Sequence, residues 1–259
     1  MVDFLDVLAQ DAKERINKGY YETAIQVSTP VISLKRAILE SEHTPIISEI
    51  KAASPSLGII RKNFSVEKVS VAMENAGAVG ISVLTEPKHF EGSLSSLTRV
   101  RRSVKLPLLM KDIIISPVQL ESASKIGANA ILLIEALINR GYCESDVHEI
   151  IAYAQSMNLE VLLEVHTEDE FSSALYTSAD MIGINNRDLR SLKVDLRVTE
   201  RILRKNDCEG KIIVSESGIK TPADLCFLHE CGVHAFLIGS AIMIASDIEK
   251  KVKEFVTAL

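Results

Sequence analysis

The sequence contains no tryptophan, and aromatic residues make up only 5% of its 259 positions. Hydrophobic residues nevertheless account for 47%, so the core must be built from isoleucine, leucine, valine and alanine. Branched aliphatic side chains are the usual filling of parallel sheets that are covered on both faces. The shortage of aromatic residues therefore favours an α/β protein.

Membrane-spanning and secretory features are also missing. No apolar run approaches the roughly 18 residues needed to span a bilayer. The N-terminus carries Asp3, Asp6 and Asp11 in place of the basic region of a signal peptide. A net charge of −6 argues against nucleic acid as the main partner. We therefore expect a soluble, cytoplasmic protein, with a monomer as the working state, that binds neither membranes nor nucleic acid.

Cysteine is scarce, and we expect no metal site. The four cysteines form no C-x-x-C pair, although Cys226, His229, Cys231 and His234 lie close together in the sequence. The segment 221–231 is typical of an amphipathic helix. Its cysteines would then face the core as small buried thiols rather than bind zinc.

Apolar runs alternate with helical patterns along the chain and predict eight β-strands. The runs are mostly continuous, as in parallel strands that are buried on both faces. The predicted strands are Ile46–Lys51, Gly80–Thr85, Pro107–Lys111, Ala130–Ile134, Glu160–Val165, Met181–Asn185, Lys211–Ser215 and Ala235–Gly239. Eight β-then-α units imply a (β/α)8 TIM barrel as a single domain over residues 1–259. A doubly wound open sheet is the alternative, but its glycine-rich first turn is absent.

Several helices carry recognisable start signals. Ser116-Pro117 and Thr221-Pro222 each place a capping hydroxyl before a proline at the first helical position. Ser65 precedes a helix predicted over Val66–Ala76, and residues 167–170 have the pattern of a capping box. These signals support helices between the strands.

The first 44 residues precede the first strand and predict an N-terminal helical extension. Leu5, Leu8, Ala12 and Ile16 mark one face of a helix, and Val31–Leu39 offers a second helix. We expect these extra helices to cover a barrel end. The inward face of the last helix in the chain is predicted to comprise Ile248, Val252, Phe255 and Leu259.

Polar residues gather at the predicted strand exits, which form the active-site face of a barrel. Glu49 and Lys51 are two positions apart on one strand and therefore share a face. A carboxylate and an ammonium at the end of an apolar strand are costly unless they are paired or used. Six strands end in such groups, which are Glu49 with Lys51, Lys111 with Asp112, Glu164 with His166, Asn185 to Arg187, Ser215 to Gly218, and Gly239 with Ser240. Their convergence predicts an active site, in which Asp112 and His166 are either surface residues or supporting partners.

A phosphate site is predicted where the last two strands end. Ser217, Gly218, Gly239 and Ser240 lie there, and barrels commonly bind phosphate at this place through backbone N–H groups and a helix N-terminus. Glycines that only serve tight turns are the alternative. With Lys51 and Arg187 nearby, the expected partner is a small-molecule phosphate ester. No metal-ligand spacing or dinucleotide fingerprint is present, so we expect no cofactor.

The chain resembles the indole-3-glycerol phosphate synthases of tryptophan biosynthesis over nearly its whole length. The similarity rests on the segments Ile47–Gly58, Leu84–Glu86, Phe90–Ser93, Pro107–Asp112, Gly127–Ile134, Glu164–His166, Gly183–Leu189, Ser215–Gly218 and Phe236–Gly239. The resemblance implies a carboxy-lyase that converts 1-(2-carboxyphenylamino)-1-deoxyribulose 5-phosphate into indole-3-glycerol phosphate, with loss of carbon dioxide and water. The aromatic ring would attack the C2 carbonyl, the carboxylate would leave, and dehydration would complete the indole.

The resemblance also implies roles for individual residues. Lys111 would be the general acid of ring closure with Glu164 as its partner, and Lys51 with Glu49 a second acid–base pair. The residues that orient the sugar and the lysines would be Asn185 and Glu216, and those that complete the polar lining would be Ser54 and Arg187. The apolar slot for the anthranilate ring would comprise Pro55, Phe90, Ile113, Leu189 and Leu237.

The chain departs from the family pattern at three positions. Family members often carry a basic residue at Ala52, arginine at Met110, and glycine or asparagine at Glu91, which puts the surrounding electrostatics in doubt. Two other functions stay open. Phosphoribosylanthranilate isomerase would need a cysteine at a strand exit, where this chain has none. A non-catalytic phosphometabolite-binding barrel would have no reason to keep both lysines and their carboxylates.

Overall fold

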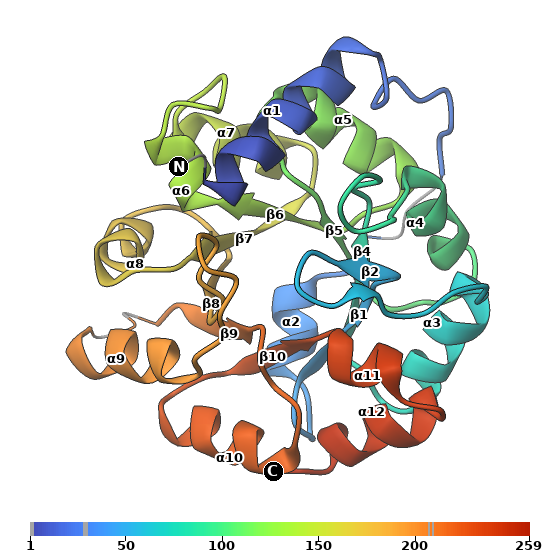
Figure 1. Cartoon of the computed structure of the whole chain (residues 1–259), viewed down its shortest axis with the longest axis vertical. Helices are drawn as coiled ribbons and strands as arrows, with labels where there is room; N and C mark the ends of the chain where they lie inside the picture. Colours follow the sequence, from blue (N-terminus) through green and yellow to red (C-terminus); the bar gives the residue numbers. More distant parts are fainter. Residues whose placement is uncertain (1–2, 28–30, 207, 209) are drawn as a thin grey trace.

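Eight parallel strands form a closed barrel in this chain (Figure 1). The computed structural model describes residues 3–27, 31–206, 208 and 210–259. The barrel strands are β1 (Ile46–Ile50), β4 (Gly80–Leu84), β5 (Leu108–Lys111), β6 (Ala130–Ile134), β7 (Glu160–Val165), β8 (Met181–Asn185), β9 (Ile212–Glu216) and β10 (Ala235–Ile238). Each strand pairs with its neighbour in the chain, and β10 closes the ring on β1. The predicted barrel is confirmed, with strand boundaries correct to within about one residue.

Helices surround the barrel between successive strands. They are α3 (Val66–Asn75), α4 (Leu94–Arg101), α5 (Pro117–Ile126), α6 (Glu135–Asn139), α7 (Val147–Ser156), α8 (Glu168–Leu175), α9 (Arg197–Lys205), α10 (Pro222–Glu230), α11 (Ser240–Ile244) and α12 (Ile248–Val256). Ser116 and Thr221 are N-caps before a proline, as predicted, and each also forms a capping box, which was not predicted. The box predicted at Thr167 is only half formed, because Thr167 caps Glu170 but the Glu170 carboxylate binds the amide of His166 instead.

Alternate side chains of each strand enter two different apolar layers. Ile47, Leu109 and Leu162 face the barrel interior, whereas Ile46 and Leu133 pack against the surrounding helices. The two-residue period of a strand produces this division. Because both faces of the barrel sheet are packed with apolar side chains, charged side chains from the strands can reach open space only at the two ends of the barrel.

The two N-terminal helices cover opposite ends of the barrel. In α1 (Phe4–Asn17), Leu5 and Leu8 line a cavity at the carboxyl ends of the strands. In α2 (Leu34–Leu39), the amide of Leu34 donates a hydrogen bond of 2.7 Å to Glu160 at the amino end of β7. Figure 1 accordingly shows α2 within the ring of strands and α1 at the upper rim, near α5, α6 and α7. The prediction that these helices cover a barrel end is therefore refined to one helix at each end.

Three local predictions are wrong. The helix predicted from Val31 begins at Leu34, because Ser33 caps its N-terminus, and Val31 is 83% exposed. The last helix ends at Val256, which leaves Leu259 47% exposed instead of inward. Cys226 is exposed on α10 rather than buried.

A short hairpin after β1 was not predicted. It consists of β2 (Ala53–Ser54) and β3 (Gly58–Ile59), which pair in antiparallel fashion. Arg61 attaches the hairpin to α11 through hydrogen bonds from its guanidinium group to the carbonyl oxygens of Met243, at 2.8 Å, and Ala245. The hairpin therefore stands beside the carboxyl ends of the strands.

Candidate active site

A cavity opens at the carboxyl ends of the barrel strands, and every residue that was assigned a catalytic or binding role lines it, whereas His166, Asn186 and Ser215 of the same strand exits do not. The charged and amide residues are Glu49, Lys51, Lys111, Glu164, Asn185, Arg187 and Glu216. The apolar and small residues are Ser54, Pro55, Phe90, Ile113, Leu189, Ser217, Gly218, Leu237, Gly239 and Ser240. The structure thus brings together side chains that lie far apart in the sequence.

Glu49 and Lys51 form an ion pair at the end of β1. Their charged atoms are 2.6 Å apart, as expected for side chains two positions apart on one strand. The second carboxylate oxygen of Glu49 is buried and has no hydrogen-bond partner in the part of the chain that the structure describes. Gly239 lies against this carboxylate, and a Cβ there would collide with Glu49 Oε1. Glycine at 239 therefore makes room for Glu49.

Lys111 lies between two carboxylates that come from other strands. Its Nζ is 2.7 Å from Glu216 Oε2 and 3.2 Å from Glu164 Oε2. Asn185 on β8 donates a hydrogen bond of 3.0 Å to Glu164 Oε1. A Cβ at Gly183 would collide with Glu216 Oε1, which has no hydrogen-bond partner among the described residues. The nearest carboxylate of Lys111 is therefore Glu216, which the sequence had suggested only as an orienting group.

The buried charges shift one another's proton affinities. Burial alone would lower the pKa of Lys111, but Glu216 and Glu164 outweigh it and raise that pKa. Burial alone would raise the pKa of Glu164, but Lys111, His166 and Asn185 together outweigh it and lower that pKa. Burial raises the pKa of Glu216 to about 7, against the opposing effect of Lys111. The site therefore holds a cationic lysine, an ionised carboxylate and a carboxyl group of raised pKa.

Two consecutive asparagines after β8 point to different places. Asn185 lines the cavity. Asn186 is buried outside it, donates to the carbonyl oxygen of Glu216 at 3.0 Å, and accepts from the hydroxyl of Thr199 at 2.8 Å. Arg187 lines the cavity and donates to the carbonyl oxygen of Leu192 at 2.9 Å. Asn186 is thus a structural link between β8, β9 and α9.

The predicted phosphate residues form one corner of the cavity. Ser217 and Gly218 follow β9 with φ angles of 65° and 92°, the left-handed conformation in which glycine costs least. Gly239 is the N-cap of α11, and Ser240 is the first residue of that helix. Because the first amides of a helix lack intrahelical acceptors, their N–H groups are available to an anion.

The apolar wall of the cavity includes residues that the sequence did not indicate. Phe4, Leu5 and Leu8 of α1 join the predicted apolar residues in lining it. Leu5 and Leu8 had been assigned only to the inward face of a helix. A helical period of apolar residues predicts a buried face, but it does not tell a core from a ligand cavity.

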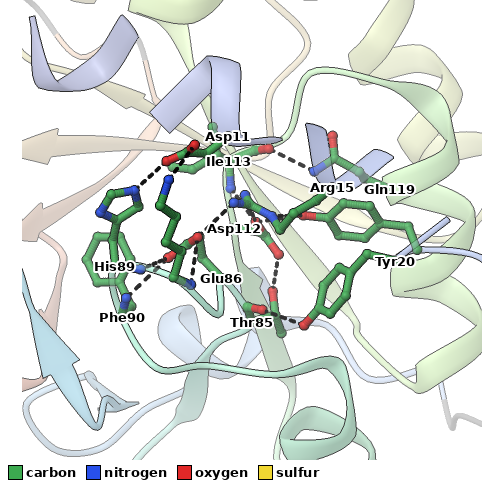
Figure 2. Close-up of polar contacts among 12 residues, drawn as sticks. Asp11, Arg15, Tyr20, Thr85, Glu86, His89, Phe90, Asp112, Ile113 and Gln119 are labelled. Atoms are coloured by element: carbon green, nitrogen blue, oxygen red, sulfur yellow. Dashed lines mark hydrogen bonds and ion pairs between the residues drawn. The ribbon is translucent and has the colours of Figure 1, made fainter. Parts of the chain in front are cut away.

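A separate polar cluster attaches α1 to the loop after β4 (Figure 2). The fully buried carboxylate of Glu86 accepts hydrogen bonds from Arg15 Nη1 at 2.7 Å and from the backbone amides of Lys88, His89 and Phe90. These amides curl the loop around the carboxylate and place Phe90 at the cavity. Asp11 on α1 adds an ion pair of 2.8 Å with Lys88.

Asp112 belongs to this second cluster, although it directly follows Lys111. Its carboxylate accepts hydrogen bonds from Thr85 Oγ1 at 2.6 Å, from Tyr21 OH at 3.1 Å and from the amide of Ile113 at 2.8 Å. Arg15 Nη2 is 3.6 Å from it. Of the two possibilities left open, Asp112 is the supporting partner rather than a surface residue.

The three departures from the family pattern have different structural settings. Met110 is fully buried on the helix-facing side of β5, so its side chain brings no charge to the cavity. Ala52 directly precedes the hairpin, and its carbonyl oxygen accepts from the amide of Ile60 at 2.7 Å. Glu91 is exposed and has a φ angle of 51°. Glycine and asparagine are the residues that adopt this left-handed conformation most readily.

The described residues contain neither a cluster of metal-ligating side chains nor a membrane-spanning helix. No group of three or more His, Cys, Asp or Glu side chains there is arranged to hold a metal ion. His234, one of the four clustered residues near the C-terminus, instead accepts a hydrogen bond of 3.1 Å from the amide of Ile213. None of the described helices is long and apolar enough to cross a bilayer.

Relatives of known identity match most of the chain. A family model described as indole-3-glycerol phosphate synthase matches residues 6–255. The indole-3-glycerol phosphate synthase of Methanocaldococcus jannaschii is 44% identical over 232 residues, which cover 87% of this chain and 83% of the relative. The enzyme of the same name from Desulforamulus reducens is 37% identical over 242 residues, or 93% of this chain and 90% of the relative.

Solved structures show the same fold at lower identity. An N-acetylmannosamine-6-phosphate 2-epimerase from Clostridium perfringens aligns with a TM-score of 0.60 and 14% identity over 84% of this chain and 93% of that chain. A thiamine phosphate pyrophosphorylase from Pyrococcus furiosus aligns with a TM-score of 0.59 and 17% identity over 86% of this chain and 96% of that chain. At these identities the likeness supports the barrel fold alone.

Proposed function

The chain belongs to the indole-3-glycerol phosphate synthase family, and on that premise we propose how its barrel mouth performs the reaction. The enzyme is a carboxy-lyase of tryptophan biosynthesis that acts on a small phosphate ester. The two alternative functions are not favoured, because the family match spans nearly the whole chain. The observation that carries the mechanism is the position of Lys111, whose ammonium group lies between Glu164 and Glu216 in a buried cavity.

Ring closure needs an acid at the C2 carbonyl oxygen of the substrate. Lys111 is the acid, since its raised pKa keeps it protonated at neutral pH. Attack of the substrate's aromatic carbon on C2 forms the new carbon–carbon bond while the carbonyl oxygen takes the proton. The ionised carboxylate of Glu164 stabilises the ammonium before transfer, and Lys111 takes up a proton from solvent afterwards. Departure of carbon dioxide then restores the aromatic ring.

Dehydration needs a second acid and a base. Lys51 and Glu49 form an ion pair with each other and supply both groups. Lys51 donates a proton to the departing hydroxyl group, and Glu49 removes a proton from C1. The unpaired oxygen of Glu49 leaves this carboxylate free to take that proton. The products of this step are the indole ring and water.

The remaining cavity residues hold the two ends of the substrate. The phosphate binds at Ser217, Gly218, Gly239 and Ser240, where backbone N–H groups favour an anion. The anthranilate ring lies against the apolar wall that includes Phe90.

Because every proposed residue comes from one chain, we also propose a monomer as the working state, and a cytoplasmic location where its biosynthetic substrate is available.

A direct assay tests the proposal. The purified chain should convert 1-(2-carboxyphenylamino)-1-deoxyribulose 5-phosphate into a product with indole fluorescence in the presence of EDTA and without any nucleotide. Absence of product would contradict the assignment of the reaction. Activity that is lost with EDTA and restored by a metal ion would contradict the cofactor-free mechanism alone. Size-exclusion chromatography at the assay concentration tests the monomer.

A further inference from the structure

His166 is a buried imidazole at the exit of β7 that the mechanism above does not use. Its side chain is only 12% exposed and lies between two carboxylates. Nε2 is 3.2 Å from Glu164 Oε1, and Nδ1 is 3.6 Å from Glu170 Oε2. The histidine therefore connects Glu164, in the cavity, with the first turn of α8.

The two oxygens of Glu164 have different neighbours. Oε2 faces Lys111 at 3.2 Å. Oε1 accepts a hydrogen bond from Asn185 at 3.0 Å and faces His166. The last torsion of a glutamate is broad, so contacts on the Oε1 edge decide how well Oε2 is aimed at the lysine. His166 occupies the side of the carboxylate that is opposite Lys111.

His166 is itself fixed by α8. The carboxylate of Glu170 accepts a hydrogen bond of 2.7 Å from the backbone amide of His166. Neither ring nitrogen has a well-aligned hydrogen-bond partner among the described residues, despite the short distance to Glu164. An unsatisfied buried donor costs stability, and hydrogen bonds in unliganded active sites often tighten only when substrate binds.

We propose that His166 is a positioning residue for Glu164, which holds the Oε1 edge of that carboxylate so that Oε2 stays directed at Lys111. The proposal rests on the proposed function, since it needs Glu164 to act in ring closure. It assigns the histidine a role in the reaction without contact with the substrate. A histidine retained only for packing would have no effect through Glu164.

The charges around His166 agree with this role. Burial alone would lower its pKa, but Glu164 and Glu170 outweigh that effect and raise the pKa to about 9, so the ring is cationic at neutral pH. Two further charged groups act on this arrangement, Lys111 beyond Glu164 and Glu135 of α6 beside Glu170, and the pocket that His166 and Glu170 line also contains Arg140 and Arg201. An imidazolium between two carboxylates attracts the near edge of each.

The test compares two substitutions of His166 with a matched control. His166→Leu removes the N–H donor at similar size, and His166→Gln places an amide N–H at about the reach of Nε2. We expect His166→Leu to lower kcat by about 10- to 100-fold, with KM changed less than about threefold, because small displacements of catalytic groups have effects of this size. His166→Gln should recover most of kcat. His43→Leu, at an exposed histidine before β1, should leave both constants unchanged.

A double-mutant cycle with Glu164→Gln decides whether His166 acts through Glu164. If it does, adding His166→Leu to Glu164→Gln should lower kcat by less than about twofold further. A full additional loss, or a His166→Leu enzyme as active as His43→Leu, would overturn the positioning role and leave the proposed function intact. A fully active Glu164→Gln enzyme would overturn both. If His166→Leu does not fold by circular dichroism, His166→Asn, whose amide is too short to reach Glu164, takes its place in the cycle.

Discussion

Two clusters of buried charge meet at the exit of β5, and their carboxylate oxygens differ in how many hydrogen bonds they accept. Lys111 belongs to the cluster in the cavity, and the next residue, Asp112, binds the cluster beneath α1. In the cavity, one oxygen each of Glu49 and Glu216 has no hydrogen-bond partner among the described residues. Beneath α1, the carboxylate of Glu86 alone accepts four hydrogen bonds.

The difference separates chemistry from scaffold. A buried polar atom without a partner costs about 1–3 kcal/mol, so a folded chain retains one where something other than stability requires it. The cluster around Lys111 leaves two carboxylate oxygens without a partner, whereas the cluster beneath α1 leaves no carboxylate oxygen unpaired among the described residues, only Arg15 Nη2, and holds α1 and the loop of Phe90 in place. Substitutions in the first cluster should therefore change activity most, and those in the second should change stability.

The largest expected effects come from the adjacent pair at the exit of β5. Lys111→Met should lower kcat at least about 100-fold, the usual contribution of a general acid. Asp112→Asn should keep kcat within about threefold but lower the free energy of unfolding by about 2 kcal/mol, because its carboxylate hydrogen bonds weaken. Steady-state kinetics and denaturant unfolding measure both. A reversal of these two patterns would break the distinction between the clusters.

Gly239 should show a comparable effect on substrate binding. Gly239→Asp puts a carboxylate beside the proposed phosphate and a Cβ against Glu49. Two unit charges about 4 Å apart repel by about 4 kcal/mol at an effective dielectric of 20, so KM should rise more than about 100-fold. Gly232→Asp is the control for KM, since a Cβ there meets nothing within 4 Å, and the strain that its φ angle of 99° imposes on aspartate affects stability. Equal KM values for the two variants would place the phosphate elsewhere.

Most of the barrel could be predicted from the sequence because its signals are local. Continuous apolar runs such as Ala130–Ile134 identify buried strands, and hydroxyl–proline pairs such as Ser116-Pro117 identify helix starts. Closure of the barrel then places all strand exits at one end. The sequence could thus bring Glu49 and Lys111 together without knowledge of any distance.

The rest depends on long-range contacts that leave no local pattern. Nothing beside Glu86 in the sequence indicates that Arg15, 71 positions away, pairs with it. The predicted start of α2 and the predicted end of α12 were wrong. The capping residues Ser33 and Thr257 set these helix ends, and the apolar period does not reveal them. Glu216 was expected only to orient other groups, since its short distance to Lys111 exists only in the folded barrel.

The third prediction concerns the free energy of unfolding, which the buried carboxyl group of Glu216 makes dependent on pH. Burial raises the pKa of Glu216 to about 7 from an ordinary value of 4.5. The folded chain therefore binds this proton more tightly than the unfolded chain, so the contribution of Glu216 to stability is present below pH 4.5 and is lost as pH rises through 7. Glu216→Gln cannot titrate, and its stability relative to the original chain should increase between pH 5 and pH 8 by on the order of 1 kcal/mol. Parallel curves of unfolding free energy against pH would contradict this.

The smallest expected effect lies outside both clusters, at Glu91 in the loop that Glu86 organises. Glu91 is exposed, and its φ angle of 51° is left-handed. Left-handed backbone costs a residue with a side chain about 1–2 kcal/mol, whereas glycine adds about 0.4–1 kcal/mol of entropy to the unfolded chain. Glu91→Gly should therefore raise the free energy of unfolding by about 0.5 kcal/mol and leave kcat unchanged. Glu42→Gly is the control, since Glu42 is exposed but not left-handed, and it should lower the free energy of unfolding because only the entropic term applies. Equal losses of stability in the two variants would show that the loop does not strain Glu91. The cluster beneath α1 would then hold Phe90 at the cavity without conformational strain in the backbone of the neighbouring residue.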